Sequence, residues 1–431
     1  MALRVVIMLI MLLAGFFLSL RWPFWGVLLV AFWYFFRPEM WGAEFAIRPV
    51  FWWTLAAVIG YFLSSDADKS ARNAWWLLGM LALMALSTAY GYDVRQNSWD
   101  RLWVITKLFA FCFLVLKVCD SPRRIAAFMV ALLLGCLWIS KAVLYGWAAQ
   151  RYSADARVDK LVAQGGGANY IALLFVITLP LLVLGFLRAS DKRLKIACLA
   201  GVGLWIASIL ATGSRGGFLG LVVVGIMLLI THRRFTALAG VTAIAAAFFL
   251  LAPPQFYERL GSITLDTAKM DRSSLMRWYN LNAGVEVMRN NPVFGIGFMN
   301  FPEAAEPYLP TDYPGIRGVN YSHNTYLQIG TENGIPALLF FLTITGVLLW
   351  RLAQPAPPGI PGRPLIEWVR HGTLVGLVAL LVCSFFGDNA GTDPFWWFYA
   401  AGFTCTALYH GRTAEDESPT LDEKAAAPAA A

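Results

Sequence analysis

One histidine of this chain occupies a position suited to proton transfer. His323 ends a long polar stretch and comes directly before an apolar run, next to Asn324. An unperturbed imidazole has a pKa of about 6.5, so near neutral pH it is mostly unprotonated and can accept a proton from a hydroxyl group. The other histidines, His232, His371 and His410, lie beside basic residues at the ends of apolar runs, which is typical of interfacial anchors. We therefore expect His323 to be the catalytic residue.

A polar stripe supports this role, although a lone histidine at the start of a helix is more often structural. Asn324, Gln328 and Glu332 follow one another at spacings of four residues, so they share one helical face. A polar stripe that enters an apolar segment usually lines a cavity. Asp388, near the end of the penultimate apolar run, either orients His323 or a bound substrate, or is an ordinary helix-end residue.

Arg215 is the first candidate for binding an anion. It lies in the turn Gly213–Gly217 between two apolar runs. A charge at the centre of a membrane costs roughly 2.5–3.5 kcal/mol, so such a residue normally has a partner or a task. The next helix begins here, and its N-terminal amides favour an anion; the alternative is an interfacial arginine in a helical hairpin. Lys107 and Lys141 also lie within apolar runs. Together with Arg215, they predict a pocket for a polyanion such as pyrophosphate.

Arg277 is the second candidate. It lies on a helix predicted over 273–290, which Asp271 or Ser273 caps. An apolar stripe along this helix predicts that it lies on the membrane or on the bundle; the stripe consists of Trp278, Leu281, Val285 and Met288. Arg277 is adjacent to the stripe and can reach a lipid-borne phosphate. The alternatives for this role are Arg259, Arg272 and Arg289.

Two other patterns are too weak to indicate a metal or a nucleotide. Asp66-Ala67-Asp68 matches the acidic pair of metal-dependent glycosyltransferases, but a carboxylate pair alone rarely builds a metal site. Gly295-Ile296-Gly297 lacks the third glycine and the preceding strand of a dinucleotide site. We therefore predict no metal and no cofactor. Three tyrosines either stack on a ring of a bound substrate or belong to the interface belt; they are Tyr308, Tyr313 and Tyr321.

The composition indicates which elements position these residues. The chain is 58% hydrophobic and only 14% charged, whereas a soluble domain has about 25% charged residues. Repeated apolar runs, 235–252 among them, predict an all-α polytopic membrane protein with about twelve transmembrane helices. We expect transmembrane helices over 1–252, a loop with amphipathic helices covering the site over 253–323, and C-terminal transmembrane helices over 324–411. Residues 412–431 are rich in alanine, proline and acidic residues, which predicts a disordered cytoplasmic tail.

The charge pattern gives an orientation. The net charge of +8 comes from Lys and Arg in short loops between apolar runs, which reflects membrane topology and not nucleic-acid binding. The loop set that includes residues 188–195 and 351–370 is the richer in Lys and Arg, so we expect it to be cytoplasmic. The loop 253–323, the Gly213–Gly217 turn and the loop 387–393 then face the opposite side. The short first two runs leave the side of the N-terminus open.

Several segments together resemble the O-antigen ligase/polymerase superfamily. They are Tyr257-Glu258-Arg259, Asp271-Arg272-Ser273, Arg277 four residues before Leu281, Asn291-Pro292-Val293-Phe294-Gly295-Ile296-Gly297-Phe298, Ser322-His323-Asn324-Thr325-Tyr326 and Glu332-Asn333-Gly334. Ser214-Arg215-Gly216 is similar to the family's upstream arginine motif, and Asn169 to another recurrent position. The resemblance covers roughly residues 165–350. The first 120 residues or so look closest to the O-glycosylation ligase branch.

The resemblance implies a GT-C-like, metal-independent membrane glycosyltransferase of the bacterial inner membrane. Such enzymes move a glycan from undecaprenyl pyrophosphate to an acceptor on the periplasmic face. In the ligases the acceptor is a sugar hydroxyl of lipid A–core, and the product is lipopolysaccharide. The family's ligand arginines fall on Arg215 and Arg277, and its essential histidine falls on His323.

Other functions fit parts of the pattern. An O-antigen polymerase and a protein O-glycosylation ligase share these motifs and the lipid-linked donor, so the acceptor stays open. A transporter of lipid-linked glycan needs a basic cavity but no histidine. A structural subunit of an envelope complex needs none of Arg215, Arg277 and His323.

Overall fold

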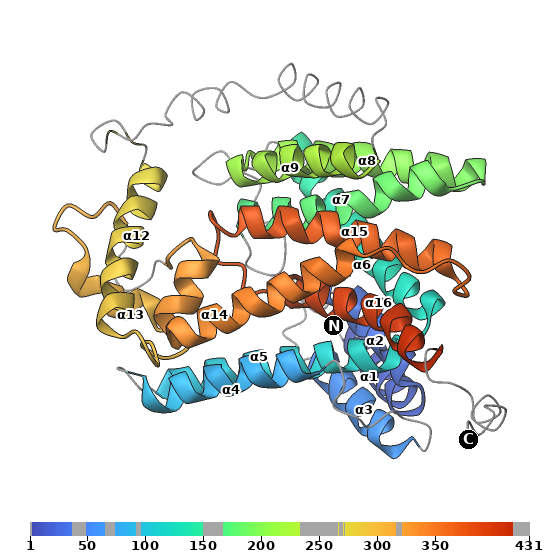
Figure 1. Ribbon diagram of the computed structural model, residues 1–431, viewed down its shortest axis with the longest axis horizontal. Coiled ribbons are helices and arrows are strands. Elements are labelled where there is room, and N and C mark those ends of the chain that lie inside the picture. The colour runs from blue at the N-terminus through green and yellow to red at the C-terminus, as the bar shows by residue number, and fades with distance from the viewer. Residues whose placement is uncertain are drawn as a thin grey trace, which may run out of the picture.

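The computed structural model describes residues 2–36, 49–64, 74–91, 96–149, 167–232, 272–315 and 321–416, together with positions 266 and 270. All regular structure within these ranges is helical (Figure 1). The predicted all-α class is therefore confirmed for the described part of the chain. The predicted apolar run 235–252 and the tail from 417 onward lie outside the described residues.

The helices before the site follow the apolar runs of the sequence closely. They are α1 (Ala2–Arg21), α2 (Pro23–Phe36), α3 (Pro49–Leu63), α4 (Trp75–Tyr90), α5 (Gln96–Val118), α6 (Pro122–Ala148), α7 (Ala168–Arg188), α8 (Lys192–Thr212) and α9 (Arg215–His232). The later elements are α12 (Arg272–Asn290), α13 (Phe301–Ala305), the 3-10 helix η3 (Glu306–Tyr308), α14 (Thr325–Ala353), α15 (Arg363–Cys383) and α16 (Asp393–Asp416).

Several helices have the length and composition of membrane spans. Within the described ranges, α6, α7, α8, α14 and α15 are long and apolar enough to cross a bilayer. Shorter apolar helices accompany them, namely α1, α2, α3, α4 and α9. The chain is thus a multi-pass helical membrane protein. The total of about twelve spans stays a prediction, because it counts the shorter helices and the run 235–252.

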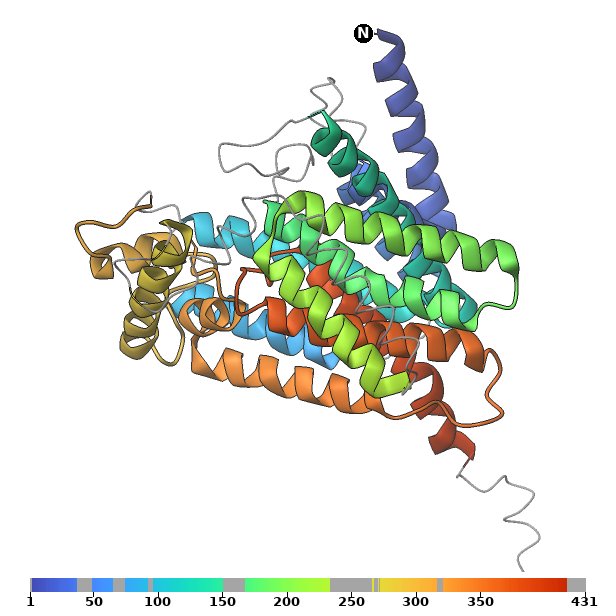
Figure 2. The same ribbon diagram turned by 90° about the horizontal axis from the view of Figure 1, so that it is seen from above.

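The long helices lie side by side, and α12 crosses one end of the bundle (Figures 1 and 2). Helix α7 packs against α8, α9 and α15, and α16 packs against α5 and α15. The turn between α8 and α9, the loop between α15 and α16, and the start of α14 meet at the end that α12 covers. The chain segments that carry the predicted site residues therefore converge at one end of the bundle.

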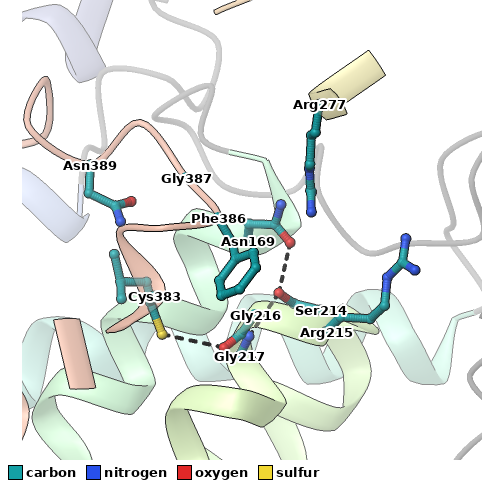
Figure 3. A pocket seen from close by; sticks show the side chains of 11 residues that line it. Asn169, Ser214, Arg215, Gly216, Gly217, Arg277, Cys383, Phe386, Gly387 and Asn389 are labelled. Atoms are coloured by element: carbon teal, nitrogen blue, oxygen red, sulfur yellow. Dashed lines mark hydrogen bonds between the residues drawn. The ribbon is translucent and has the colours of Figure 1, made fainter. Parts of the chain in front are cut away.

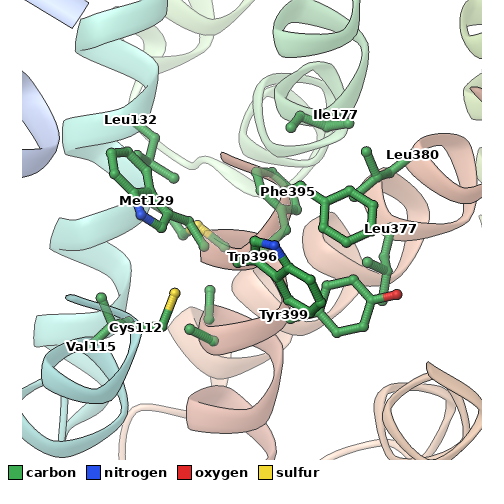
Figure 4. Close-up of a cluster of buried hydrophobic side chains, with 14 of the residues drawn as sticks. Cys112, Val115, Met129, Leu132, Ile177, Leu377, Leu380, Phe395, Trp396 and Tyr399 are labelled. Atoms are coloured by element: carbon green, nitrogen blue, oxygen red, sulfur yellow. The ribbon is translucent and has the colours of Figure 1, made fainter. Parts of the chain in front are cut away.

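Helix α16 runs through the middle of the core. Its aromatic segment Phe395–Tyr399 is buried at every position, as expected for a helix surrounded by others. Residues of α5, α6, α7 and α15 pack around it (Figure 4). All six cysteines are buried and free, as expected for cysteines that act as small apolar packing residues. This rigid centre fixes the start of α16 and the loop before it.

A break in α14 joins two motifs of the sequence. Gly334 has φ +84° and ψ 167°, which interrupts the helix. The segment 292–297 docks at the break, since the Ile296 and Gly297 amides each donate over 3.0 Å to the carbonyls of Thr331 and Glu332. The Ile335 amide donates to the Pro292 carbonyl over 2.7 Å. The backbone of the segment after α12 is thus pinned to α14, the helix that begins just after His323.

Glycine is required on both sides of this contact. Gly295 has φ +70°, and a Cβ there would lie 2.5 Å from the Glu332 carbonyl oxygen. A Cβ on Gly334 would lie 2.0 Å from the Val293 carbonyl oxygen. Only glycine permits both the positive φ and this close backbone approach.

Candidate active site

His323 is held by the loop between α15 and α16. Its backbone has φ +53°, a conformation that is uncommon outside glycine. The His323 amide donates to Asp388 Oδ2 over 3.0 Å, and Nδ1 of the ring lies 3.3 Å from the same oxygen. The Ser322 hydroxyl donates to Asp388 Oδ1 over 2.7 Å. Asp388 therefore contacts both the unusual backbone and the ring of His323. The sequence left open whether Asp388 orients another group or is an ordinary helix-end residue, and the structure shows that it contacts His323.

The loop that carries Asp388 is itself fixed to the start of α14. The Thr325 hydroxyl donates to the Gly387 carbonyl over 2.7 Å and accepts from the Asn389 amide over 2.9 Å. The Asn324 side chain caps α14 by accepting from the Tyr326 and Leu327 amides, each over 3.0 Å. The predicted helix start after His323 is confirmed. Its cap leaves the His323 side chain outside the helix.

Arg215 is the first residue of α9 and follows a sharply built turn. Gly213 ends α8 in the left-handed conformation with φ +60°. The Ser214 hydroxyl accepts from the Gly217 amide over 3.1 Å and donates to Asn169 Oδ1 over 2.7 Å (Figure 3). These bonds tie the turn to α7 and fix the direction in which α9 starts. The N-terminus of α9 lies at the site, where the helix dipole favours an anion.

Arg277 reaches the same place from the other side. Its side chain extends from α12 toward the Ser214–Arg215 turn (Figure 3). Nη2 of Arg215 donates to the Ser274 hydroxyl, one helical turn before Arg277, over 3.4 Å. The two predicted ligand arginines thus come from helices far apart in the sequence and border one space.

That space is a cavity of about 490 Å³ between α9, α12 and the loops at His323 and Asp388. Its polar lining comes from Arg215, Ser274, Arg277, Ser322, His323 and Asn324. Its apolar lining comes from Phe218, Leu219, Met270, Trp278, Leu281, Phe385 and Phe386. A small polar recess at the start of α9 adjoins it and includes Asn169 and Asn389 (Figure 3). The cavity therefore offers cationic groups and a histidine beside a large apolar surface.

Two lysines that were predicted to join Arg215 do not lie in this cavity. The Lys107 ammonium lies over the rings of Phe51 and Trp103, and Lys141 lines a different cavity. The prediction of one pocket formed by all three residues is wrong. All three residues lie within or beside apolar runs, but their side chains lie in different parts of the bundle.

The other arginines considered for the phosphate site lie elsewhere. Nε of Arg272 donates to the Pro314 carbonyl over 2.9 Å, and Arg289 is exposed near the end of α12. Neither is among the residues that line the cavity. Arg259 lies outside the described residues, as do Asp66 and Asp68. In the ranges that the structure describes, no three His, Cys, Asp or Glu side chains form a group that could hold a metal ion.

Helix α12 packs on the bundle through a face other than its apolar stripe. The predicted helix is confirmed, but its buried residues are Asn280, Ala283, Gly284 and Val287. A Cβ on Gly284 would lie 2.5 Å from a methyl carbon of Leu327, so the small residues allow α12 to lie close against α14. Of the predicted apolar stripe, Trp278 and Leu281 face the cavity instead. Both are substantially exposed.

The polar stripe on α14 also has a different place. Asn324 lines the cavity, whereas Gln328 and Glu332 are buried and do not line it. The expectation that all three face one cavity is therefore wrong. The docked segment 292–297 closes over the Glu332 side of the helix, as its hydrogen bond to the Glu332 carbonyl shows.

The three tyrosines do not line the cavity either. Tyr313 is buried and donates to Asn280 Oδ1 over 3.0 Å, and the Tyr308 hydroxyl accepts from Asn290 over 2.8 Å. The Tyr321 carbonyl accepts from Asn280 over 2.8 Å. Burial raises the pKa of the Tyr321 phenol above its ordinary value. This tyrosine therefore stays protonated at neutral pH and does not compete with His323 as a base.

Fold and cavity together define a multi-pass membrane protein in which two arginines, a helix N-terminus and a histidine–aspartate pair surround an amphipathic cavity. Residues 199–342 match a family model described as O-antigen ligase. This segment contains Arg215, Arg277 and His323, and it is an O-antigen ligase domain of the O-antigen ligase/polymerase family. No curated protein matches the chain.

Proposed function

We propose that this protein is an O-antigen ligase of the bacterial inner membrane. In this proposal it transfers O-antigen glycan from undecaprenyl pyrophosphate to a sugar hydroxyl of lipid A–core on the periplasmic face, completing lipopolysaccharide. The observation that carries the proposal is the single cavity that Arg215, Arg277 and His323 line together. The family match over residues 199–342 supports the same reaction class.

The donor fits the two kinds of surface in the cavity. Arg215, Arg277 and the start of α9 are suited to a pyrophosphate, because guanidinium groups and helix N-terminal amides both favour phosphate oxygens. The apolar lining, which includes Phe218, Phe385 and Phe386, suits the first isoprene units of the lipid. Binding the leaving group in this way places positive charge where negative charge grows in the transition state.

The histidine–aspartate pair supplies the base. Because Nδ1 of His323 faces Asp388 at 3.3 Å, the carboxylate favours the tautomer that carries its proton on Nδ1. Nε2 then accepts the proton of the acceptor hydroxyl as that oxygen attacks the anomeric carbon. The bond from this carbon to the pyrophosphate oxygen breaks, and its electron pair leaves with undecaprenyl pyrophosphate. Asp388 is a positioning residue in this scheme, and His323 is the catalytic residue.

No step of this reaction calls for a metal or a cofactor, because the arginines supply the positive charge at the leaving group. The test is reconstitution of the purified protein with undecaprenyl-pyrophosphate-linked glycan and rough lipopolysaccharide, with chelator present. We expect glycan transfer to lipid A–core under these conditions. Activity that disappears with chelator and returns with a divalent metal would overturn the metal-independent reaction.

The same assay separates the ligase from its alternatives. Elongation of the lipid-linked glycan without transfer to lipid A–core would indicate a polymerase. Transfer to a protein acceptor would indicate an O-glycosylation ligase. Movement of donor across the vesicle membrane, unchanged in His323→Ala, would indicate a transporter.

A further inference from the structure

A second cavity lies between α2, α6 and α8 and has a volume of about 690 Å³. Its lining includes Phe32, Leu134, Leu137, Trp138, Lys141 and Leu204. It shares no lining residue with the cavity of Arg215 and His323. The reaction proposed above therefore makes no use of it.

Lys141 is the only charged residue among the described residues that line this second cavity. The side chain is exposed, and its Nζ lies 4.8 Å from the centroid of the Trp138 ring. In the part of the chain that the structure describes, no carboxylate forms an ion pair with it. An indole ring attracts an ammonium group by roughly 0.5–2 kcal/mol but leaves its charge in place. The charge is thus available to an anion.

Contacts between α6 and α8 give the depth of Lys141. The Ser140 and Ser208 hydroxyls share a hydrogen bond of 2.8 Å, and Ser208 is one helical turn before the end of α8 at Thr212. The Arg215 turn follows directly. Lys141 therefore lies in the half of the bundle that carries the candidate active site. It is about 10 Å from the end of α6 at a rise of 1.5 Å per residue, a depth from which a lysine side chain can extend toward lipid headgroups.

The walls of the cavity are open to the surroundings of the bundle. Leu134 is 51% exposed, Leu137 43% and Phe32 36%. In a multi-pass membrane protein, lipid hydrocarbon is the medium that such a surface meets. A cation beside an apolar groove is complementary to a lipid with a negatively charged headgroup, because one molecule can fill the groove and neutralise the charge.

We propose that this groove binds one anionic phospholipid from the leaflet on the side of the active site. Its phosphate pairs with Lys141, and one acyl chain lies against Phe32, Leu134 and Leu137. The lipid links α2, α6 and α8 from outside and takes no part in glycan transfer.

Native mass spectrometry of the full-length protein tests this proposal. The protein is incubated with phosphatidylglycerol or with phosphatidylcholine that has the same acyl chains. We expect one phosphatidylglycerol to be retained with a preference of about fivefold, the effect of roughly 1 kcal/mol per lysine near a membrane surface. Lys141→Gln should abolish the preference. Lys107→Gln is the matched control, since Lys107 also lies within an apolar helix but contacts the rings of Phe51 and Trp103.

A second variant tests the groove itself. Leu134→Trp places a larger side chain in the groove and should reduce phosphatidylglycerol retention while Lys141 is unchanged. The proposal is overturned if the unmodified protein retains both lipids equally, or if Lys141→Gln keeps the preference. It is also overturned if Lys107→Gln loses the preference to the same extent, or if Leu134→Trp retains phosphatidylglycerol as before. Glycan-transfer activity is a separate readout, so the failure of either proposal can be recognised without the other.

Discussion

Two histidines in opposite halves of the bundle each face a carboxylate, and their surroundings differ. Nδ1 of His323 lies 3.3 Å from Asp388, and Nδ1 of His371 lies 3.4 Å from Glu367. The ring of His371 also contacts arginines on both nitrogens, with Arg188 at 2.5 Å from Nδ1 and Arg370 at 2.8 Å from Nε2. Both ring nitrogens of His371 thus have protein partners.

His323 differs because it borders a cavity. Its side chain is 36% exposed and lines the same space as Arg215 and Arg277. A carboxylate beside an imidazole is therefore not by itself a sign of catalysis. The contact of His371 with Arg188 ties α15 to α7 in the half that was predicted to be cytoplasmic. In the proposed reaction, the pair at His323 instead leaves Nε2 for the acceptor hydroxyl.

The largest effect should come from replacing the two histidines in turn. His323→Ala removes the proposed base, so we expect glycan transfer to fall by about 10²–10⁴-fold. Donor binding should persist, because the arginines remain. His371→Ala should keep the transfer rate within a few-fold and lower the thermal stability, since it removes contacts between α7 and α15. Steady-state transfer assays, donor-binding measurements and thermal unfolding in detergent separate these outcomes. Equal losses of transfer in the two variants would contradict the distinction drawn between the histidines.

Replacing Arg215 or Arg277 tests the proposed donor site. Arg215→Ala and Arg277→Ala should each lower glycan transfer by about 10²–10³-fold, the usual cost of removing a group that stabilises transition-state charge. Both variants should also weaken binding of undecaprenyl pyrophosphate, which can be measured by competition with labelled donor. Arg289→Ala is the matched control, because Arg289 lies on α12 but is exposed and does not line the cavity. Donor binding unchanged in Arg277→Ala would remove this residue from the donor site.

Asp388→Asn tests the positioning of His323. Asparagine keeps an oxygen that can accept from the His323 amide but cannot hold the imidazole as a carboxylate does. We expect glycan transfer to fall by about 10–100-fold, which is less than the loss of the base itself. The pH profile of kcat should change with it, and the donor affinity should not. Glu367→Gln is the counterpart in the other half and should leave the pH profile as it is. An unchanged profile in Asp388→Asn would assign Asp388 to backbone support alone.

The smallest effect concerns the contact that fixes α14. Gly334→Ala adds a Cβ atom that would lie 2.0 Å from the Val293 carbonyl oxygen. We expect a loss of stability of about 1–3 kcal/mol, the usual cost of a strained backbone position, and a modest fall in transfer. Gly346→Ala on the same helix is the control, because no atom lies within 4 Å of a Cβ there. Thermal unfolding of the two variants measures the difference. Equal stability would show that the docked segment 292–297 adjusts without cost.

Several features could be predicted from the sequence because they depend on local rules. Apolar runs near the length of a membrane span determine helices wherever the chain lies in lipid, and within the described ranges the helices follow those runs. The polar interval before His323 contains a helix at 272–290, close to its predicted bounds.

Which side chains are in contact depends on the tertiary structure. Sequence reasoning put Lys141 and Arg215 in one pocket, but the rotation of each helix about its axis directs them into different cavities. The hydrophobic stripe of α12 left open whether the helix lies on the membrane or on the bundle. In the structure α12 packs on the bundle through a face that includes Ala283 and Gly284, because such small residues allow close approach. The contact of Asp388 with His323 joins residues 65 positions apart. No local pattern encodes such contacts, since they follow from how the whole bundle packs.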